Sequence, residues 1–273
     1  MLHVLALLTV TSAAAVQPIV SSGWLQAHLS DPQVRVIDVG DAGDYKKAHI
    51  PGARVLDHMA TARMDARGHV MAPPDVLARV LAAAGAADGA HVILYGDTPM
   101  ATAWVNTALR IIGHGDEVSW LDGGFPTWQA EHRPVESAAP PAGTGPLSIR
   151  SSPGFIVDAP WLRGRLTSPD TKILDVRSQG EWNDGHLPNA TLILWQDLFA
   201  DRKMQTFKSP ADIRALLAKA GVGPHQEVVT YCAIGMRASL MGWAAGVAGV
   251  PAKIYLGSWE DWIRDPQNRI VKP

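Results

Sequence analysis

Short apolar runs alternate with longer stretches of helical periodicity in the second half of the chain. Each run is only a few residues long and combines apolar with β-branched side chains, which is typical of a buried strand. Strands that alternate with helices pair in parallel, so the pattern predicts an α/β fold with a parallel sheet flanked by helices on both faces. The predicted strands are Lys172–Asp175, Ala190–Leu194, Glu227–Tyr231 and Lys253–Leu256.

Two helices are predicted between these strands. Residues Pro210–Ala220 place Ile213, Leu216 and Leu217 on one helical face, which indicates an amphipathic helix. Residues Met236–Gly249 are small and apolar nearly all round. A helix without a polar face is typically buried, so we expect this one to lie inside the protein.

The chain carries the same pattern twice. Residues 35–53 read RVIDVGDAGDYKKAHIPGA, and residues 172–190 read KILDVRSQGEWNDGHLPNA. Further matches follow in the same order and at nearly the same spacing, HVILY with EVVTY and GGFPTW with GSWEDW. Ordered self-similarity of this kind indicates a tandem duplication.

The duplication predicts two domains of similar size. We expect the first copy over residues 18–134 and the second over residues 153–270. Residues 135–152 are predicted to form the linker, because this region is rich in Pro, Gly, Ala and Ser and has no apolar period. Either copy is long enough to bury a core of its own.

The N-terminus differs from the rest of the chain. Residues 2–16 are an apolar run that ends in small residues, and Ala13-Ala14-Ala15 fits the cleavage pattern of a secretory signal. Residues 1–15 are therefore predicted to be a signal peptide, and the protein to be periplasmic or secreted. The run is preceded by neither Lys nor Arg, which leaves a buried terminal strand or helix as the alternative. Because a membrane-spanning helix needs ~20 apolar residues, no stable membrane insertion is expected.

Composition excludes several functions. The 273 residues include 24 Lys and Arg and 26 Asp and Glu, a net charge of −2 without charge runs, so a basic stripe for nucleic acid is missing. The chain has one cysteine, which cannot form an internal disulfide. Its ten histidines show no H-x-x-H spacing and there is no C-x-x-C, so we predict neither a metal nor a cofactor.

The single cysteine, Cys232, follows the predicted strand Glu227–Tyr231 and precedes the predicted helix from Met236. In a parallel α/β sheet, ligands bind beyond the carboxyl ends of the strands. Backbone N–H groups of the loop and the positive end of the helix dipole are expected to converge on the sulfur and to stabilise a thiolate or persulfide anion. The alternative is that Cys232 only packs in the core as a small apolar side chain, since free cysteine is often buried.

The loop after Cys232 supplies the other candidate residues. Gly235 gives the backbone freedom that a tight loop needs, and Arg237 is a cation for an anionic donor. The spacing is C-x4-R, one residue shorter than the C-x5-R of phosphatases and arsenate reductases, so the smaller loop disfavours that third alternative. The predicted substrate-binding residues of this loop are Ala233, Ile234, Gly235, Met236 and Arg237.

Taken together, these motifs resemble the rhodanese family. The repeated D-V-R…E-W…G-H-L-P-x-A block, the cysteine loop after an apolar strand and the closing G-S-W-x-x-W are similar to its tandem members, the thiosulfate and 3-mercaptopyruvate sulfurtransferases. The resemblance extends over about residues 18–270. It implies two tandem rhodanese-like domains, of which the first is inactive and the second catalytic.

The resemblance also implies roles for particular residues. The first copy has Gly96 at the position of Cys232, followed by Asp97, which would repel an anionic substrate. Arg177 matches the substrate-anchoring arginine of the tandem enzymes, and the first copy has Gly40 there. The alternative for Arg177 is a structural salt bridge across the domain interface.

The implied activity is sulfur transfer by a ping-pong mechanism. Cys232 would accept sulfur as a persulfide from a small anionic donor, thiosulfate or a related compound, and pass it to a thiophilic acceptor such as cyanide, a thiol or a partner protein. The tandem enzymes carry cationic residues or Gly-Ser-Gly after the cysteine, whereas this chain has Ala233 and Ile234, so the donor stays open. The alternative function is a sulfur carrier that relays persulfide sulfur to a partner protein.

His49 and His186 occur at equivalent positions in the two copies. A catalytic base would be expected only in the active copy. Both histidines are therefore predicted to make structural hydrogen bonds.

Overall fold

The computed structural model of the chain describes residues 16–66, 68–141, 145–150, 152, 154–203 and 206–272. The predicted signal peptide lies outside the described residues. The first copy contains β1 (Ile19–Val20), α1 (Ser22–His28), β2 (Val34–Val39), α2 (Ala42–Tyr45), β3 (Arg54–Val55), the 3-10 helix η1 (His58–Thr61), β4 (Ala62–Asp65), β5 (Gly68–Met71), α3 (Pro74–Ala83), β6 (His91–Gly96), α4 (Pro99–Ile111), the 3-10 helix η2 (Gly115–Glu117), β7 (Val118–Leu121) and α5 (Gly124–Ala130).

The second copy repeats most of this order. It contains β8 (Ile156–Val157), α6 (Ala159–Arg163), β9 (Thr171–Asp175), α7 (Gln179–Asp184), β10 (Ala190–Leu192), the 3-10 helix η3 (Trp195–Leu198), α8 (Pro210–Lys219), β11 (Glu227–Tyr231), α9 (Met236–Val247), β12 (Ala252–Tyr255) and α10 (Ser258–Trp262).

Each copy builds a five-stranded parallel sheet, and the two sheets have the same topology. The first has the order β1-β7-β6-β2-β3 and the second β8-β12-β11-β9-β10. The central strand of the second sheet, β11, pairs with β9 in a register that sets Tyr231 beside Asp175. Identical strand order confirms the duplication and the predicted fold class. The first copy adds an antiparallel hairpin, β4–β5.

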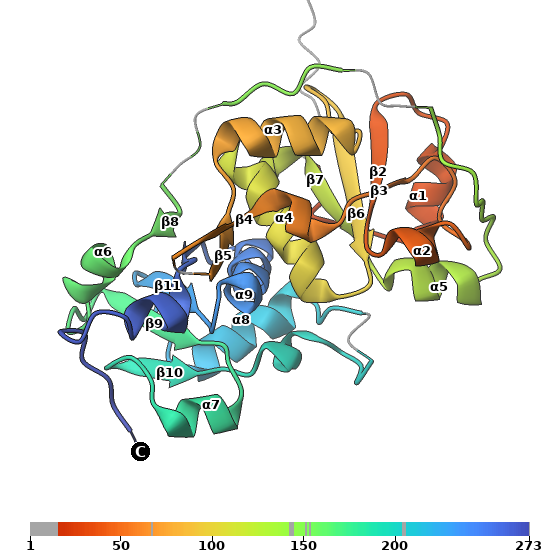
Figure 1. Ribbon diagram of the computed structural model, residues 1–273. Coiled ribbons are helices and arrows are strands. Elements are labelled where there is room, and N and C mark those ends of the chain that lie inside the picture. The colour runs from red at the N-terminus through yellow and green to blue at the C-terminus, as the bar shows by residue number, and fades with distance from the viewer. Residues whose placement is uncertain are drawn as a thin grey trace, which may run out of the picture.

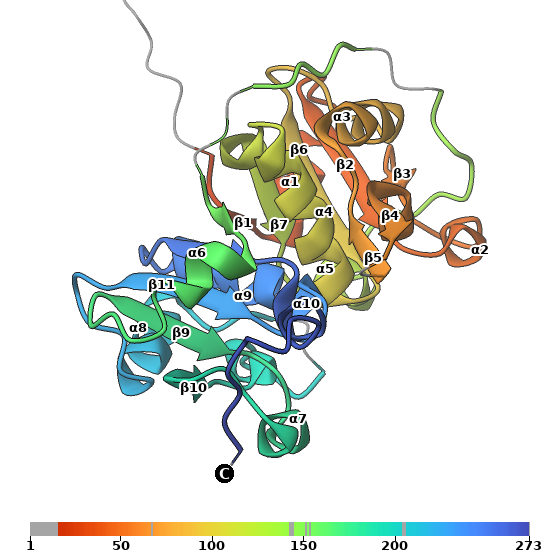
Figure 2. The same ribbon diagram turned by 60° about the vertical axis from the view of Figure 1, so that its left-hand side comes forward.

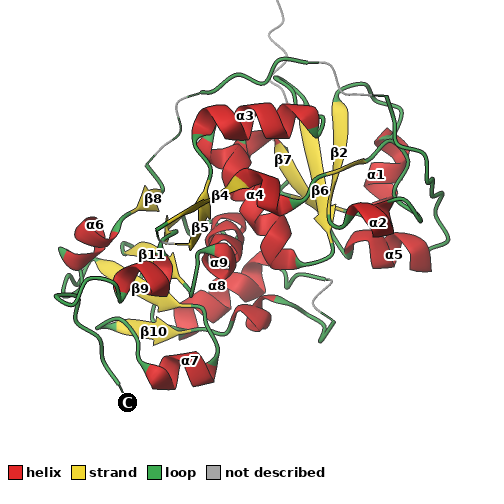
Figure 3. Cartoon of the chain, viewed as in Figure 1, coloured by secondary structure: helices red, strands yellow, loops and turns green. Residues whose placement is uncertain are grey.

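Helices cover both faces of each sheet (Figure 3), and the two-residue period of the strands decides which side chains meet them. In the first copy, Val36 and Ile93 pack toward Leu25 of α1 and Trp128 of α5. The neighbouring side chains of the same strands point to the opposite face, where α3 and α4 lie. In the second copy, α6 and α10 cover one face and α8 and α9 the other.

The two copies pack against each other through α4 and α9, which lie side by side between the sheets (Figures 1 and 2). Ala103 and Trp120 of the first copy belong to the same buried cluster as the core of the second. The Trp120 ring lies 5.1 Å from that of Phe207 and 4.7 Å from that of Trp243. This apolar contact explains why α9 has no polar face: both sides of the helix are buried.

The predicted strands and helices agree with the structure to within a few residues. The predicted strand Ala190–Leu194 is two residues too long, because β10 ends at Leu192, and the predicted helix Met236–Gly249 is likewise two residues longer than α9. The N–H of Ile193 still donates to Asp175 O (2.9 Å), but Leu194 already caps the 3-10 helix that follows. Among the described residues, no helix is long and apolar enough to cross a bilayer.

The amphipathic face of α8 gives a test of the core. Leu217 is buried, so Leu217→Ala should lower the free energy of unfolding by about 2–5 kcal/mol through lost burial and a cavity. Chemical denaturation would measure this loss. Lys219→Ala, an exposed position on the same helix, is the control and should change stability by less than about 0.5 kcal/mol. Equal losses in both variants would contradict the assigned packing.

Candidate active site

Cys232 lies between the end of β11 and the start of α9, at the carboxyl edge of the second sheet. The turn depends on Gly235, which caps α9 with φ +96°, a left-handed conformation that suits glycine. A Cβ atom on Gly235 would lie 2.5 Å from Leu256 O. The loop therefore packs directly on the backbone after β12, and this fixes the position of the sulfur.

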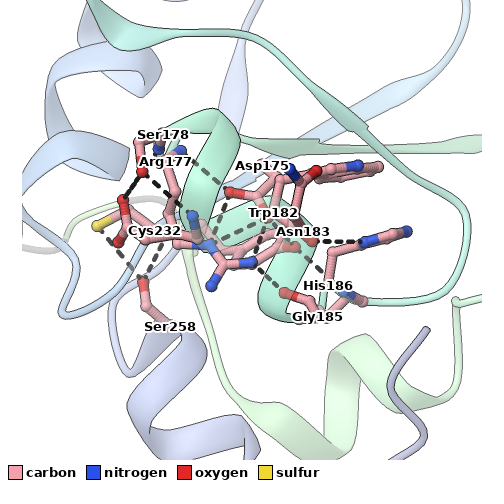
Figure 4. Close-up of polar contacts among 12 residues, drawn as sticks. Asp175, Arg177, Ser178, Trp182, Asn183, Gly185, His186, Cys232 and Ser258 are labelled. Carbon is pink, nitrogen blue, oxygen red and sulfur yellow. Dashed lines mark hydrogen bonds and ion pairs between the residues drawn. The ribbon is translucent and has the colours of Figure 1, made fainter. Parts of the chain in front are cut away.

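The sulfur of Cys232 is buried, with 1% of the residue exposed. The Gly235 N–H donates to Sγ over 3.1 Å, and the Ser258 hydroxyl lies 3.9 Å from it. Figure 4 shows Ser258 beside the sulfur of Cys232. Ser258 Oγ also accepts from the Cys232 N–H (3.0 Å) and can donate to Tyr255 O (2.8 Å). The Gly235 N–H can stabilise a negative charge on the sulfur, and the Ser258 hydroxyl can do so when its proton turns from Tyr255 O toward Sγ.

Ser258 was not identified from the sequence, although the repeat contains a signal for it. It occupies a left-handed backbone position with φ +54°, and its counterpart in the first copy is a glycine, Gly124, with φ +53°. A non-glycine residue in that conformation carries a strain of about 1–3 kcal/mol. The strained serine occurs in the copy that carries the cysteine, where its hydroxyl contacts Cys232.

Arg237 points back to α7 and forms a two-pronged ion pair with Glu181. Its Nη1 and Nη2 each lie 2.7 Å from one carboxylate oxygen. Glu181 is held in turn by Ser178, whose N–H and hydroxyl donate to the carboxylate (2.9 and 2.7 Å), in a capping box that starts α7. The hydrogen bonds from Arg237, with smaller contributions from Ser178, lower the pKa of Glu181 to about 2.

The same contacts act on the arginine. The hydrogen bonds to Glu181 raise the pKa of Arg237 against the effect of burial, and attraction to Cys232 raises it further. Arg237 thus lies between the cysteine and Glu181. The sequence predicted Arg237 as a ligand of the donor, but did not find the carboxylate that already pairs with it.

Arg177 is buried rather than open to solvent, with 2% of its side chain exposed. Its side chain points toward Asp175 and Gly185 (Figure 4). Its guanidinium donates to Asp175 Oδ2 (2.7 Å) and to Gly185 O (2.6 Å), and it lies 4.4 Å from the ring of Trp259. These contacts favour the structural ion pair, which lies within the second copy and not across the domain interface. Substrate anchoring by Arg177 stays a prediction.

The remaining loop residues face different surroundings. Met236 packs against the core of the first copy, and Ala233 accepts a hydrogen bond from the Glu260 N–H (3.1 Å). Ile234 is 37% exposed and lines a cavity of about 530 Å³ between the copies. The walls of the cavity include Met71 and Trp104 from the first copy. Substrate binding by Ala233, Ile234, Gly235 and Met236 stays a prediction.

The equivalent position in the first copy has no room for a nucleophile. A Cβ atom on Gly96 would collide with Val39 O and lie 2.6 Å from Thr102 Oγ1. The carboxylate of Asp97 accepts a hydrogen bond from the Asp41 N–H (3.1 Å) and occupies the space beside Gly40. Packing and negative charge therefore both oppose anion binding at this position.

The paired histidines behave alike in both copies. His49 Nδ1 lies 2.7 Å from Tyr45 O and its ring stacks on Tyr45, and His186 Nδ1 lies 3.2 Å from Trp182 O and its ring stacks on Trp182. This confirms the predicted structural hydrogen bonds. Among the described residues, no three His, Cys, Asp or Glu side chains gather as a metal site would require.

Comparison with known proteins assigns the family. The Rhodanese-like domain family matches residues 21–131 and 158–265, so the chain belongs to the rhodanese family and contains two such domains. It is 28% identical over 271 residues to a thiosulfate sulfurtransferase of Azotobacter vinelandii, covering 94% of this chain and 98% of that protein. It is 29% identical over 272 residues to the sulfur carrier protein TtuD of Thermus thermophilus, covering 89% and 93%.

A solved structure shows the same fold. The structure of SseA, a 3-mercaptopyruvate sulfotransferase from Escherichia coli, matches with a TM-score of 0.80 at 24% identity and covers 89% of this chain and 99% of that chain. The sequence relatives assign the chain to the sulfurtransferases.

The left-handed turn at Gly235 gives a test of the site. Gly235→Ala forces a side chain toward Leu256 O and should move the N–H away from the sulfur, so we expect kcat of sulfur transfer to fall by about 100-fold. The control is Gly246→Ala in α9, where a Cβ atom meets nothing within 4 Å; it should keep kcat and raise stability by about 0.5–1 kcal/mol. Unchanged kcat in Gly235→Ala would exclude a role for this turn.

Proposed function

We propose that the protein transfers sulfane sulfur from thiosulfate or a related donor to a thiophilic acceptor such as cyanide, through a persulfide on Cys232. The observation that supports this most is the placement of the only cysteine: it directly follows the buried central strand β11, with the Gly235 N–H 3.1 Å from its sulfur and Ser258 beside it. A cysteine that served only as packing would not need hydrogen-bond donors around its sulfur.

In the first half-reaction, the Cys232 thiolate attacks the outer sulfur of the donor. A bond forms between the two sulfur atoms, and the bond between the outer sulfur and the rest of the donor breaks. With thiosulfate, sulfite leaves with the electron pair, and the negative charge of the thiolate passes to the terminal sulfur of the persulfide. The Gly235 N–H donates to Sγ and stabilises the thiolate before this step, and the Ser258 hydroxyl adds to this when its proton turns from Tyr255 O toward the sulfur.

In the second half-reaction, the acceptor attacks the terminal sulfur of the persulfide. Cyanide forms a carbon–sulfur bond, the sulfur–sulfur bond breaks, and thiocyanate leaves while the thiolate of Cys232 is restored. No redox partner is needed over the cycle. The cavity lined by Ile234 and Gly257 lies beside the loop and is the proposed approach for a small acceptor.

The alternative function is a sulfur carrier that relays persulfide sulfur to a partner protein. The similarity to the sulfur carrier TtuD supports this alternative. The two functions differ in how Cys232 is loaded and unloaded. An enzyme turns over many times with small donors and acceptors, whereas a carrier is loaded only slowly by them and needs its protein partner.

The first prediction of this proposal concerns the nucleophile. Cys232→Ser should lower the turnover of donor and cyanide to thiocyanate by more than about a thousandfold, because the attacking thiolate is lost. Circular dichroism should show an unchanged fold. Unchanged turnover would exclude Cys232 as the nucleophile.

The second prediction concerns the intermediate. Incubation of the wild-type protein with donor alone should add about 32 Da, the mass of one sulfur atom, to Cys232 in an intact-mass measurement, and cyanide should remove it. Because Cys232 is the only cysteine, Cys232→Ser is a control without any thiol. Loading within one turnover time supports the enzyme, and loading that is much slower supports the carrier.

A further inference from the structure

The ion pair between Glu181 and Arg237 lies beside the reactive sulfur without a part in the chemistry described so far. It joins α7 to the first turn of α9, and both side chains are partly buried, with 34% of Glu181 and 18% of Arg237 exposed. Partial burial weakens screening by water, so the two charges act on each other and on their surroundings more strongly than an exposed pair.

Glu181 is fixed in place and stays ionised. Its two oxygens receive four hydrogen bonds, two from Arg237 and two from Ser178. These contacts lower the pKa of Glu181 to about 2, so the carboxylate is charged at any pH at which the enzyme would work. An incoming anionic donor must compete with this carboxylate for the guanidinium.

The charges around the sulfur do not favour a doubly charged donor. Arg237 is balanced by Glu181, and Arg177 by Asp175. The thiolate adds one more negative charge, so these groups together are negative. The N-terminus of α9 supplies roughly half a positive charge, which offsets only part of this.

The neighbouring residues do not reverse the balance. The loop after the cysteine, residues 233–236, carries no charged side chain. The N–H of Glu260 at the start of α10 donates to Ala233 O, which places another acidic residue next to this loop.

We propose that Glu181 is a specificity-determining residue: by neutralising Arg237 it makes the site select sulfur donors with at most one net negative charge, such as an alkyl persulfide, over the dianion thiosulfate. The inference rests on the proposed persulfide chemistry and names its donor class. The Cys232 thiolate attacks the outer sulfur of R–S–SH, the S–S bond of the donor breaks, and the thiolate R–S⁻ leaves with the electron pair. The proton stays on the transferred sulfur.

The experiment compares two donors in matched variants. We measure kcat/KM for thiosulfate and for cysteine persulfide in the wild-type protein, in Glu181→Gln and in Glu181→Asp. Glu181→Gln should raise kcat/KM for thiosulfate by about tenfold relative to that for cysteine persulfide, because Arg237 becomes free to bind the second charge. Glu181→Asp keeps the charge and should keep the wild-type ratio of the two donors within about twofold, even if both rates fall.

A control variant removes a charge from the same helix without touching the pair. Asp184 is exposed at the end of α7, and Asp184→Asn changes the net charge of the protein as much as Glu181→Gln does. It should leave the donor ratio unchanged. The double variant Glu181→Gln, Arg237→Gln should lose the gain for thiosulfate, because the freed guanidinium is then missing.

The dependence of kcat/KM for thiosulfate on ionic strength is a second readout, because a purely structural role of Glu181 would not change it. In the wild-type protein, kcat/KM for thiosulfate should rise with added salt, because salt screens the repulsion between the dianion and the site. In Glu181→Gln this rise should nearly vanish, whereas in Asp184→Asn it should persist.

Two outcomes would overturn the proposal. A donor ratio in Glu181→Gln equal to that of the wild-type protein would show that Glu181 does not set donor charge. Parallel losses with both donors in both Glu181 variants would show that the carboxylate only holds the loop. Failure of the underlying chemistry is distinguishable, because then neither donor would add sulfur to Cys232 of the wild-type protein.

Discussion

The close packing of the cysteine loop on the backbone after β12 is the constraint on which the site depends. Gly235 adopts a left-handed conformation and approaches Leu256 O so closely that a side chain would not fit. This contact starts α9 at Met236 and directs the Gly235 N–H at the sulfur. The next residues after β12 lead to Ser258, whose hydroxyl reaches the same sulfur. The residues that follow β11 and β12 together fix the position of the Cys232 sulfur.

The two copies have the same fold, and only the second has a cysteine at this position. Both sheets have the same strand order, and both copies keep the stacked aromatic–histidine pair that fixes the turn after the second helix of each domain. At the position of the cysteine, however, the first copy has filled the space with Thr102 and a backbone carbonyl. The first copy instead contributes its helix α4 and Trp120 to the core of the second. It also forms one wall of the cavity beside the cysteine loop.

The arginines near Cys232 are paired with carboxylates, so the site is not a cluster of unpaired positive charges. Arg177 and Arg237, both predicted from the sequence to bind substrate, form ion pairs with carboxylates of the same domain. Each pair fixes the geometry of the loop or strand end that it joins, and each reduces the positive charge available to a donor. The net charge of the site thus cannot be predicted from an arginine in a motif alone, because a carboxylate elsewhere in the chain can pair with that arginine.

The sequence by itself determined the duplication, the parallel α/β fold, the buried helix after the cysteine loop and the cysteine as the candidate nucleophile. These features follow from local spacing: strand and helix periods, and a cysteine placed between a strand and a glycine-capped helix. Only the tertiary structure decided that Ser258 touches the sulfur, that Glu181 holds Arg237 and that Arg177 is buried against Asp175 and Trp259. The physical reason is that partners such as Glu181 and Arg237, 56 residues apart, meet because parallel pairing brings the ends of β9, β11 and β12 to one edge of the sheet. The spacing of Glu181 and Arg237 along the chain does not indicate that their side chains are in contact.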